Sequence, residues 1–384
     1  MNPLANASPV SPAAYWDPGR HRAELERIFR RHWLFAGFAG QLRKPNDFIT
    51  VQAGDRSVVV CNFNGRLRAL HNVCSHRHAI LKDEPCGNGP LRCRYHGWTY
   101  DEEGRPSGIP ANRENFAFED RDKQRWGLER YDVEQVGEFV FVRVASSGPS
   151  LREHLGPLAK LFETLQQTFS MPFEEGARDW ACNWKIGVEN TLESYHVAFA
   201  HQETLAAVLD SQGRMAFQAP HSSVCHKMLP ESVAWWNDAL RRSRLVRCEA
   251  YDDYHHFFIY PNLCIGLTYG ALSSVQTFEP LTSCTSRLKY RLLLPSSDAA
   301  EQSPPAFRRV LCDYLREFNE KVLEEDGGPV QWCQEGCREM RRAACLGASE
   351  ARISAFLNAV VSDASCDPAG EKRGDDEWKK AQAC

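Results

Sequence analysis

The sequence predicts an α+β protein in which a strand-rich part precedes a part that contains both strands and long helices. Three observations support this class. Apolar residues recur at helical spacing over 21–33, short β-branched runs separated by Gly, Asp and Asn turns fill 48–144, and strand-like and helical runs follow together after 150. Runs of strands beside runs of helices are typical of α+β proteins.

Length and composition are those of a globular protein. The chain has 384 residues, 43% of them hydrophobic and 25% charged, which suggests two or three domains. A net charge of −4 and the lack of a basic stripe argue against nucleic-acid binding. No apolar run is long enough to span a membrane, and the first residues lack a signal-peptide pattern. The 15 scattered cysteines suit a reducing compartment, so we expect a cytoplasmic protein.

The elements follow in order along the chain. A helix is predicted over 21–33, where Leu25, Ile28, Phe29 and Trp33 recur at helical spacing. Turn residues bound the next runs, which are predicted as strands over 48–52, 57–61, 67–71 and 139–144. After a linker signal at 146–149, helices are predicted over 151–165, 182–199, 305–325 and 329–345. Further strands are predicted over 222–227, 255–260, 263–269, 274–278 and 287–294.

Two short ligand pairs form the first chemical motif. One residue separates Cys74 from His76, two separate Cys93 from His96, and 16 residues lie between the pairs. Thiolates and imidazoles at such spacing suit a structural zinc, or a Rieske [2Fe–2S] cluster in which two cysteines hold one iron and two histidines hold the other. A pair with a single intervening residue is tighter than the spacing typical of zinc sites, which favours the cluster.

A second group of candidate ligands lies in the helix predicted over 182–199 and just beyond it. Glu193 and His196 are three residues apart and share a helix face. His201 follows five residues later, which turns an α-helix by about 500° and leaves the two imidazoles roughly 140° apart. The two histidines reach one ion only if the helix ends or widens between them. With a distant carboxylate they would form the facial triad of non-haem Fe(II) oxygenases, whereas di-iron sites and structural histidines are the alternatives.

The carboxylate of such a triad has two candidates. Asp326 closes an acidic run at the end of the helix predicted over 305–325, where negative charge opposes the helix dipole and a nearby cation would explain it. Asp326 is equally placed to cap the helix predicted from Pro329. Glu189, one helical turn before Glu193, competes on spacing alone.

Most of the chain resembles the catalytic α-subunit of Rieske non-haem iron oxygenases. The stretch 74–98 is similar to the Rieske signature, 183–201 to the family's E-x2-H-x4-H segment, and 325–336 to its E-D-x7-Q-x-G pattern. The resemblance implies that the four residues of the first motif hold a [2Fe–2S] cluster. It further implies that a mononuclear Fe(II) is held by His196, His201 and Asp326.

The resemblance also implies a domain plan. We expect an all-β Rieske domain over 38–147 and, over 148–362, a helix-grip-like catalytic domain, which is an antiparallel sheet with helices. The N-terminal helical segment 1–37 is expected to pack on the catalytic domain, and 363–384 to be a disordered tail.

Electrons must come from a partner, because the chain contains no dinucleotide or flavin signature. We expect NAD(P)H to serve indirectly, through a reductase or ferredoxin, with O2 and a small molecule as substrates. The family works as trimers, which implies a homotrimer in which Glu193 bridges His96 of one subunit to His196 of the next.

The expected substrate class comes from a finer resemblance. Glu193 at the bridging position and the stretch 260–263 resemble the branch that acts on choline, betaine and carnitine. A pocket lined from 215–290 and the end of the 182–201 segment would bind a cation through the aromatic residues of 235–260. We therefore expect N-demethylation or C–N cleavage of a quaternary ammonium compound. Oxygenation of an aromatic ring, and electron carriage without oxygenase chemistry, are the alternatives.

Overall fold

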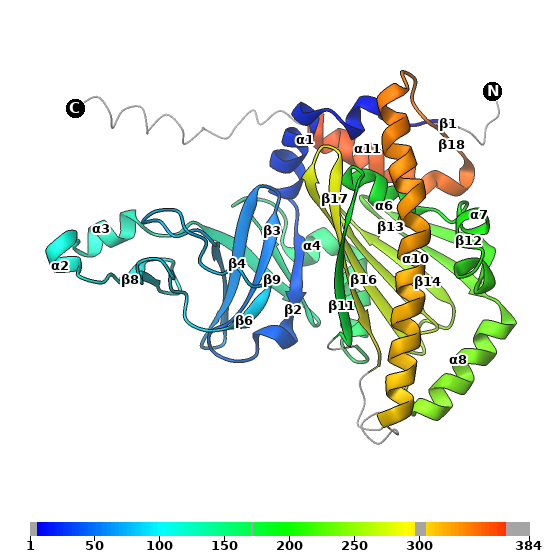
Figure 1. Cartoon of the computed structure of the whole chain (residues 1–384), viewed down its shortest axis with the longest axis horizontal. Coiled ribbons are helices and arrows are strands. Elements are labelled where there is room, and N and C mark those ends of the chain that lie inside the picture. The colour runs from blue at the N-terminus through cyan, green and yellow to red at the C-terminus, as the bar shows by residue number, and fades with distance from the viewer. Residues whose placement is uncertain (1–5, 170–171, 296–304, 366–384) are drawn as a thin grey trace.

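The structure is a computed structural model that describes residues 6–169, 172–295 and 305–365, and two seven-stranded antiparallel sheets lie side by side in it (Figure 1). The strand order is β2-β10-β9-β5-β4-β3-β6 in the first sheet and β11-β17-β16-β15-β14-β13-β12 in the second. The predicted α+β class is confirmed.

The bounds of the strands are as follows. The first sheet contains β2 (Leu34–Phe38), β3 (Asp47–Ala53), β4 (Arg56–Phe63), β5 (Arg66–His71), β6 (Cys86–Asn88), β9 (Arg130–Val136) and β10 (Phe139–Arg143). The second sheet contains β11 (Glu174–Trp180), β12 (Leu209–Gln218), β13 (His221–Met228), β14 (Tyr254–Ile259), β15 (Leu263–Thr268), β16 (Leu272–Thr282) and β17 (Thr285–Leu293). Two small pairs join β1 (Asn6–Ala7) to β18 (Cys345–Leu346) and β7 (Thr99–Tyr100) to β8 (Pro106–Gly108).

The helices lie mainly around the second sheet. Its face is covered by α6 (Trp184–Leu192) and by the long α10 (Pro305–Glu339), which runs across the strands in Figure 1. The other helices of four or more residues are η1 (Pro12–Tyr15), α1 (Pro18–Glu24), η2 (Leu25–Phe29), η3 (Ala39–Leu42), α2 (Asn112–Asn115), α3 (Asp120–Arg125), α4 (Leu151–Leu155), α5 (Ala159–Leu165), α7 (Val197–Ala200), α8 (Pro230–Ser243) and α11 (Ala351–Ser365). Among the described helices, none combines the length and apolar character needed to cross a bilayer.

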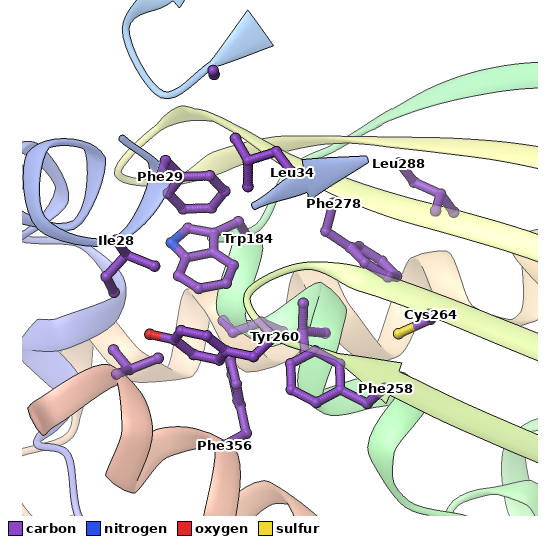
Figure 2. Close-up of a cluster of buried hydrophobic side chains, with 14 of the residues drawn as sticks. Ile28, Phe29, Leu34, Trp184, Phe258, Tyr260, Cys264, Phe278, Leu288 and Phe356 are labelled. Carbon is purple, nitrogen blue, oxygen red and sulfur yellow. The ribbon is translucent and has the colours of Figure 1, made fainter. Parts of the chain in front are cut away.

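The N-terminal segment packs into the core of the second sheet. Figure 2 shows Phe29 against Trp184 of α6, with ring centroids 4.9 Å apart, and Phe356 of α11 on another side of that indole at 5.6 Å. Lys185, beside Trp184, donates to both carboxylate oxygens of Glu24 at 2.6 and 2.8 Å. Residues from two distant parts of the chain, the N-terminal segment and α11, therefore fix the start of α6. The helical part of this segment ends at Phe29, earlier than predicted, because Leu34–Phe38 forms β2.

The helix predicted over 182–199 is interrupted. It ends at Leu192, Glu193 has extended backbone with φ −131° and ψ 166°, and α7 begins only at Val197. This interruption satisfies the geometric condition under which His196 and His201 can approach a common point.

The two helices predicted over 305–325 and 329–345 are a single helix. Pro329 lies inside α10, although proline in a helix interior costs roughly 3 kcal/mol. Packing offsets this cost, because Leu323 and Val330 are only 1% and 2% exposed in the core. The sequence suggested a break, whereas burial on both sides of the proline keeps the helix continuous.

The last predicted segment, 363–384, falls largely outside the described residues. Its first three residues end α11, which begins at Ala351 and was not predicted.

Candidate metal centres

The two loops of the first motif have the same backbone turn. The N–H of His78 donates to the Cys74 carbonyl at 2.9 Å, and the N–H of Gly97 donates to the Cys93 carbonyl at 3.0 Å. His78 and Gly97 both have positive φ, at 58° and 76°. Each turn directs its cysteine inward, so the two loops face one another with matching geometry.

The side chains of this motif form a suitable donor set. Cys74 and Cys93 are buried, whereas His96 is exposed and its ring centroid lies 4.6 Å from that of His76. Trp98 stacks on the His76 ring at 4.9 Å. The Nδ1 atom of His76 is buried and has no hydrogen-bond partner among the described residues. Two buried thiols, two neighbouring imidazoles and an unpartnered ring nitrogen fit a cluster with two cysteine and two histidine ligands.

The second group converges as expected. Donor atoms of His196, His201 and Asp326 all lie within 4.8 Å of one another. Asp326 Oδ1 is 3.0 Å from His201 Nε2 and 3.8 Å from His196 Nε2. The two histidines flank the short helix α7, and α10 brings the aspartate to them across 125 residues of sequence.

Both histidines are held by carboxylates through their other ring nitrogen. His196 Nδ1–H donates to Glu193, and His201 Nδ1–H donates to Glu325 Oε2 at 2.7 Å. Because a carboxylate only accepts, it fixes the tautomer that leaves the Nε2 lone pair free for a metal. Three carboxylates around two imidazoles also leave an excess of negative charge, which suits a divalent cation. From the sequence, Glu325 is noted only as a member of the acidic run that Asp326 closes.

Asp326 and Glu189, the two candidates for the third ligand, have different surroundings. Asp326 Oδ1 accepts a hydrogen bond from the side chain of Asn190 at 2.7 Å and faces the histidines. Glu189 accepts from the hydroxyl of Tyr15 at 2.8 Å, and burial raises its pKa to about 8. The geometry therefore groups Asp326, and not Glu189, with the two histidines.

A cavity of about 480 Å³ opens onto this group, a size ordinary for a small-molecule site. Its walls include residues from the predicted range, among them Met215, Val224, Tyr254 and Gln276. Arg352, at the start of α11, also lines the cavity and was not predicted.

The prediction that the aromatic residues of 235–260 line this cavity is wrong for most of them. Trp235 and Trp236 lie on α8 and face a neighbouring cavity of about 500 Å³, and Tyr260 is in the core. Among the described residues, Tyr254 is the one Phe, Tyr or Trp side chain that lines the cavity at the histidines. The sequence identified the aromatic residues, but it could not show that α8 places both tryptophans at the neighbouring cavity.

Comparison with known families agrees with this geometry. Residues 171–363, half of the chain, match the family described as ring hydroxylating alpha subunit (catalytic domain), and residues 32–132 match the Rieske [2Fe-2S] domain. The chain belongs to the Rieske ring-hydroxylating oxygenase family. Membership confirms the expected [2Fe–2S] cluster and non-haem iron as the cofactors and the expected fold, and it removes the zinc alternative for the first motif.

Individual relatives of this family member are moderately similar. Choline monooxygenase of Amaranthus tricolor is 30% identical over 70% of this chain and 59% of its own length. The glycine betaine monooxygenase oxygenase subunit of Pseudomonas aeruginosa (strain UCBPP-PA14) is 31% identical over 62% of this chain and 57% of its own. The chain thus spans less than two thirds of the curated relatives it matches.

A solved structure covers almost the whole fold. The quaternary ammonium Rieske monooxygenase in complex with its substrate L-carnitine superposes with a TM-score of 0.76 at 19% identity, over 95% of this chain and 97% of that chain. At this identity the likeness establishes the fold.

Proposed function

We propose that this chain is the terminal oxygenase component of a system that uses O2 and electrons from NAD(P)H, delivered by a reductase directly or through a ferredoxin. The observation that carries the proposal is the convergence of His196, His201 and Asp326 at a small-molecule cavity, in a chain that also contains the Rieske motif. A Rieske electron carrier has no use for this second donor set.

The proposed ligand roles follow the two donor sets. Cys74, His76, Cys93 and His96 hold the [2Fe–2S] cluster, and the histidine-aspartate group holds the iron. When bound, these cofactors supply one-electron storage and the reductive activation of O2. We assign the cluster to the domain 38–147 and the iron to the domain 148–362.

Hydrogen bonds with neighbouring side chains orient the three proposed iron ligands. Glu193 holds the proton of His196 at Nδ1, Glu325 does the same for His201, and Asn190 fixes one carboxylate oxygen of Asp326. Such partners orient ligands and raise their basicity.

We propose that electrons pass between subunits of a homotrimer. Figure 1 shows α2 at one end of the molecule and α7 at the opposite end, and Phe116 next to α2 packs on Trp98 of the cluster loop, with ring centroids 5.5 Å apart. A route within one chain would have to run the length of the molecule.

Features around His196 suit a neighbouring subunit. His196 also lines a second hollow of about 720 Å³, which includes Glu193. Nearby, Tyr195 and Phe199 are 65% and 71% exposed, which is typical of an interaction surface. We propose that Glu193 bridges the exposed His96 of the neighbour to His196.

The proposed reaction is hydroxylation of a carbon bound to nitrogen, leading to N-demethylation or C–N cleavage. Support comes from the choline and glycine betaine monooxygenases among the relatives. Hydroxylation of an N-methyl group consumes O2, two electrons and two protons, gives water, and releases the carbon as formaldehyde when the C–N bond breaks.

Two measurements test the proposal. Purified, reconstituted protein should contain three irons and two acid-labile sulfides per chain, and two irons would instead indicate a carrier. With a surrogate reductase, O2 uptake should be coupled to formaldehyde release from methylated amines and betaines. Coupled oxidation of benzoates alone would replace N-demethylation by ring oxygenation and leave the metal roles intact.

A further inference from the structure

The cavity at the iron residues contains a buried cation without an anion. Arg352 is 1% exposed and lines the cavity. Its Nε–H donates to Ser222 Oγ at 3.0 Å and Nη2 donates to His256 Nδ1 at 3.1 Å, while the carbonyl oxygens of Leu192 and Ser222 lie 3.5 Å away. Within 6–169, 172–295 and 305–365, no Asp or Glu oxygen lies within 4 Å of this guanidinium.

Such an arrangement is costly unless something compensates it. Burying an ion costs several kcal/mol, and neutral acceptors recover only part of that. Burial lowers the pKa of Arg352 to about 10, which still leaves it charged at neutral pH. His256 cannot compensate this charge, because an imidazole is either neutral or positive, and burial and then Arg352 hold its pKa well below the ordinary value.

Another buried cation of this chain, Lys185, has an anionic partner. Lys185 is as deeply buried as Arg352, but it has Glu24 as a partner at 2.6 and 2.8 Å. Arg352 has no such partner in the part of the chain that the structure describes and instead borders a space large enough for a small molecule. Arg352 thus has a cavity beside it where Lys185 has a carboxylate.

The carboxylates that line the same cavity are already engaged. Asp326 faces His201 and accepts from Asn190, and Glu193 accepts from His196. The rest of the described lining holds no further Asp, Glu, Lys or Arg; it combines polar side chains such as Gln276 and Ser349 with apolar ones such as Met215 and Val224. Apart from Glu193 and the metal group, the described part of this lining presents a single positive charge, that of Arg352, and a single Phe, Tyr or Trp ring, that of Tyr254.

We propose that Arg352 binds a carboxylate of the substrate, so that the substrate is a small carboxylic acid whose reacting carbon faces the iron residues. This inference rests on the proposed function and narrows it. A zwitterion such as a betaine satisfies Arg352, whereas a cation without a carboxylate, such as choline, meets an uncompensated positive charge. A planar fork of N–H donors also matches carboxylate geometry.

The test is binding without turnover, in the reconstituted holoenzyme with no reductase present. Calorimetric titration compares three matched pairs: glycine betaine with choline, benzoate with benzamide, and acetate with acetamide. In each pair whose carboxylate binds, we expect the carboxylate to bind roughly tenfold or more tightly than its partner, as a charge-assisted contact at a buried site gives.

Variants separate Arg352 from other causes of a preference. Arg352→Gln should reduce the preference to near unity while keeping iron content and thermal midpoint, and Arg352→Lys should retain part of it. His196→Ala, which should lack the iron, is expected to keep the preference for carboxylates, because Arg352 is still present. If the carboxylate bound the metal directly, the preference would be lost in this variant. If Arg352→Gln does not fold, equal binding within the wild-type pairs, or loss of the preference in His196→Ala, still overturns the proposal.

The outcomes distinguish this proposal from the one on which it rests. Equal binding within all three pairs, absence of carboxylate binding, or an undiminished preference in folded Arg352→Gln overturns the role of Arg352. A carboxylate preference that depends on Arg352, without coupled O2 consumption once reductase is added, contradicts the oxygenase function and leaves the anion site standing.

Discussion

The side-chain oxygen of Gln334 accepts a hydrogen bond from the backbone N–H of Asn183 at 2.7 Å, and its amide donates to the Tyr15 carbonyl at 3.1 Å. One buried side chain of α10 thus holds the residue that caps α6. Because α10 carries Asp326 and α6 leads to His196, this contact sets the distance between the two halves of the proposed iron site.

Replacing Gln334 with Leu should therefore destabilise both the fold and the iron site. The buried N–H of Asn183 would lose its acceptor, at a cost of about 1–3 kcal/mol. Urea unfolding and iron analysis measure the two effects. Gln331→Leu, on the exposed side of the same helix, is the matched control and should change neither. Equal stability of the two variants would show that the Gln334 contact contributes little.

Asp326→Asn should lose the mononuclear iron, all turnover, and none of the cluster absorbance. A neutral amide removes the anionic ligand while keeping the shape that Asn190 contacts. Glu189→Gln, which removes the competing carboxylate, should keep a full complement of iron because Glu189 faces Tyr15. Iron analysis and the visible spectrum are the measurements. The reverse pattern would make Glu189 the third ligand.

Glu193→Gln should keep both metals and the fold but slow turnover, by roughly tenfold to a hundredfold on the scale seen for residues that support a metal ligand. The amide still accepts from His196 Nδ1–H, so the ligand stays oriented, but the charge proposed to bridge the subunits is lost. Stopped-flow oxidation of the reduced cluster under O2 and substrate measures the electron step directly. Glu163→Gln, at an exposed ion pair with Arg152, serves as the control. Unchanged cluster oxidation in Glu193→Gln would place the electron route elsewhere.

The contribution of Glu189 to stability should fall as the pH rises from about 5 to 8. Burial, the largest influence, raises the pKa of this carboxyl to about 8, whereas an unfolded glutamate ionises near pH 4.5. In this window the folded chain binds more protons than the unfolded chain, so deprotonation favours unfolding, by at most about 1.4 kcal/mol per pH unit. The unfolding free energy of the wild type minus that of Glu189→Gln should therefore decrease over this range. A constant difference would mean that Glu189 is already ionised in the fold.

Sequence reasoning succeeded where the chemistry is local. The cluster ligands lie within one short stretch, and Glu193, His196 and His201 within another, so spacing identified both groups as candidate ligands and the family resemblance assigned their roles. Asp326 needed the family resemblance, because 125 residues separate it from His201 and only the path of α10 brings them together. Arg352 carried no local signal at all.

Two errors have physical causes that no local pattern shows. The run Gly327 to Pro329 predicts a helix break, but tertiary burial of Leu323 and Val330 keeps α10 intact. The tryptophans of α8 suggested a substrate pocket, but which wall a helix faces depends on the elements packed around it.

The two sites differ in how much of the chain they require. All strands of the first sheet and all four proposed cluster ligands lie between Leu34 and Arg143, whereas the iron cavity is complete only when Asp326 and Arg352 are present. A proteolytic or truncated product that ends after β10 would therefore still carry every group needed for a red-brown chromophore. During purification, colour reports the first of the two sites, and only a total iron count or ligand binding reports an intact oxygenase.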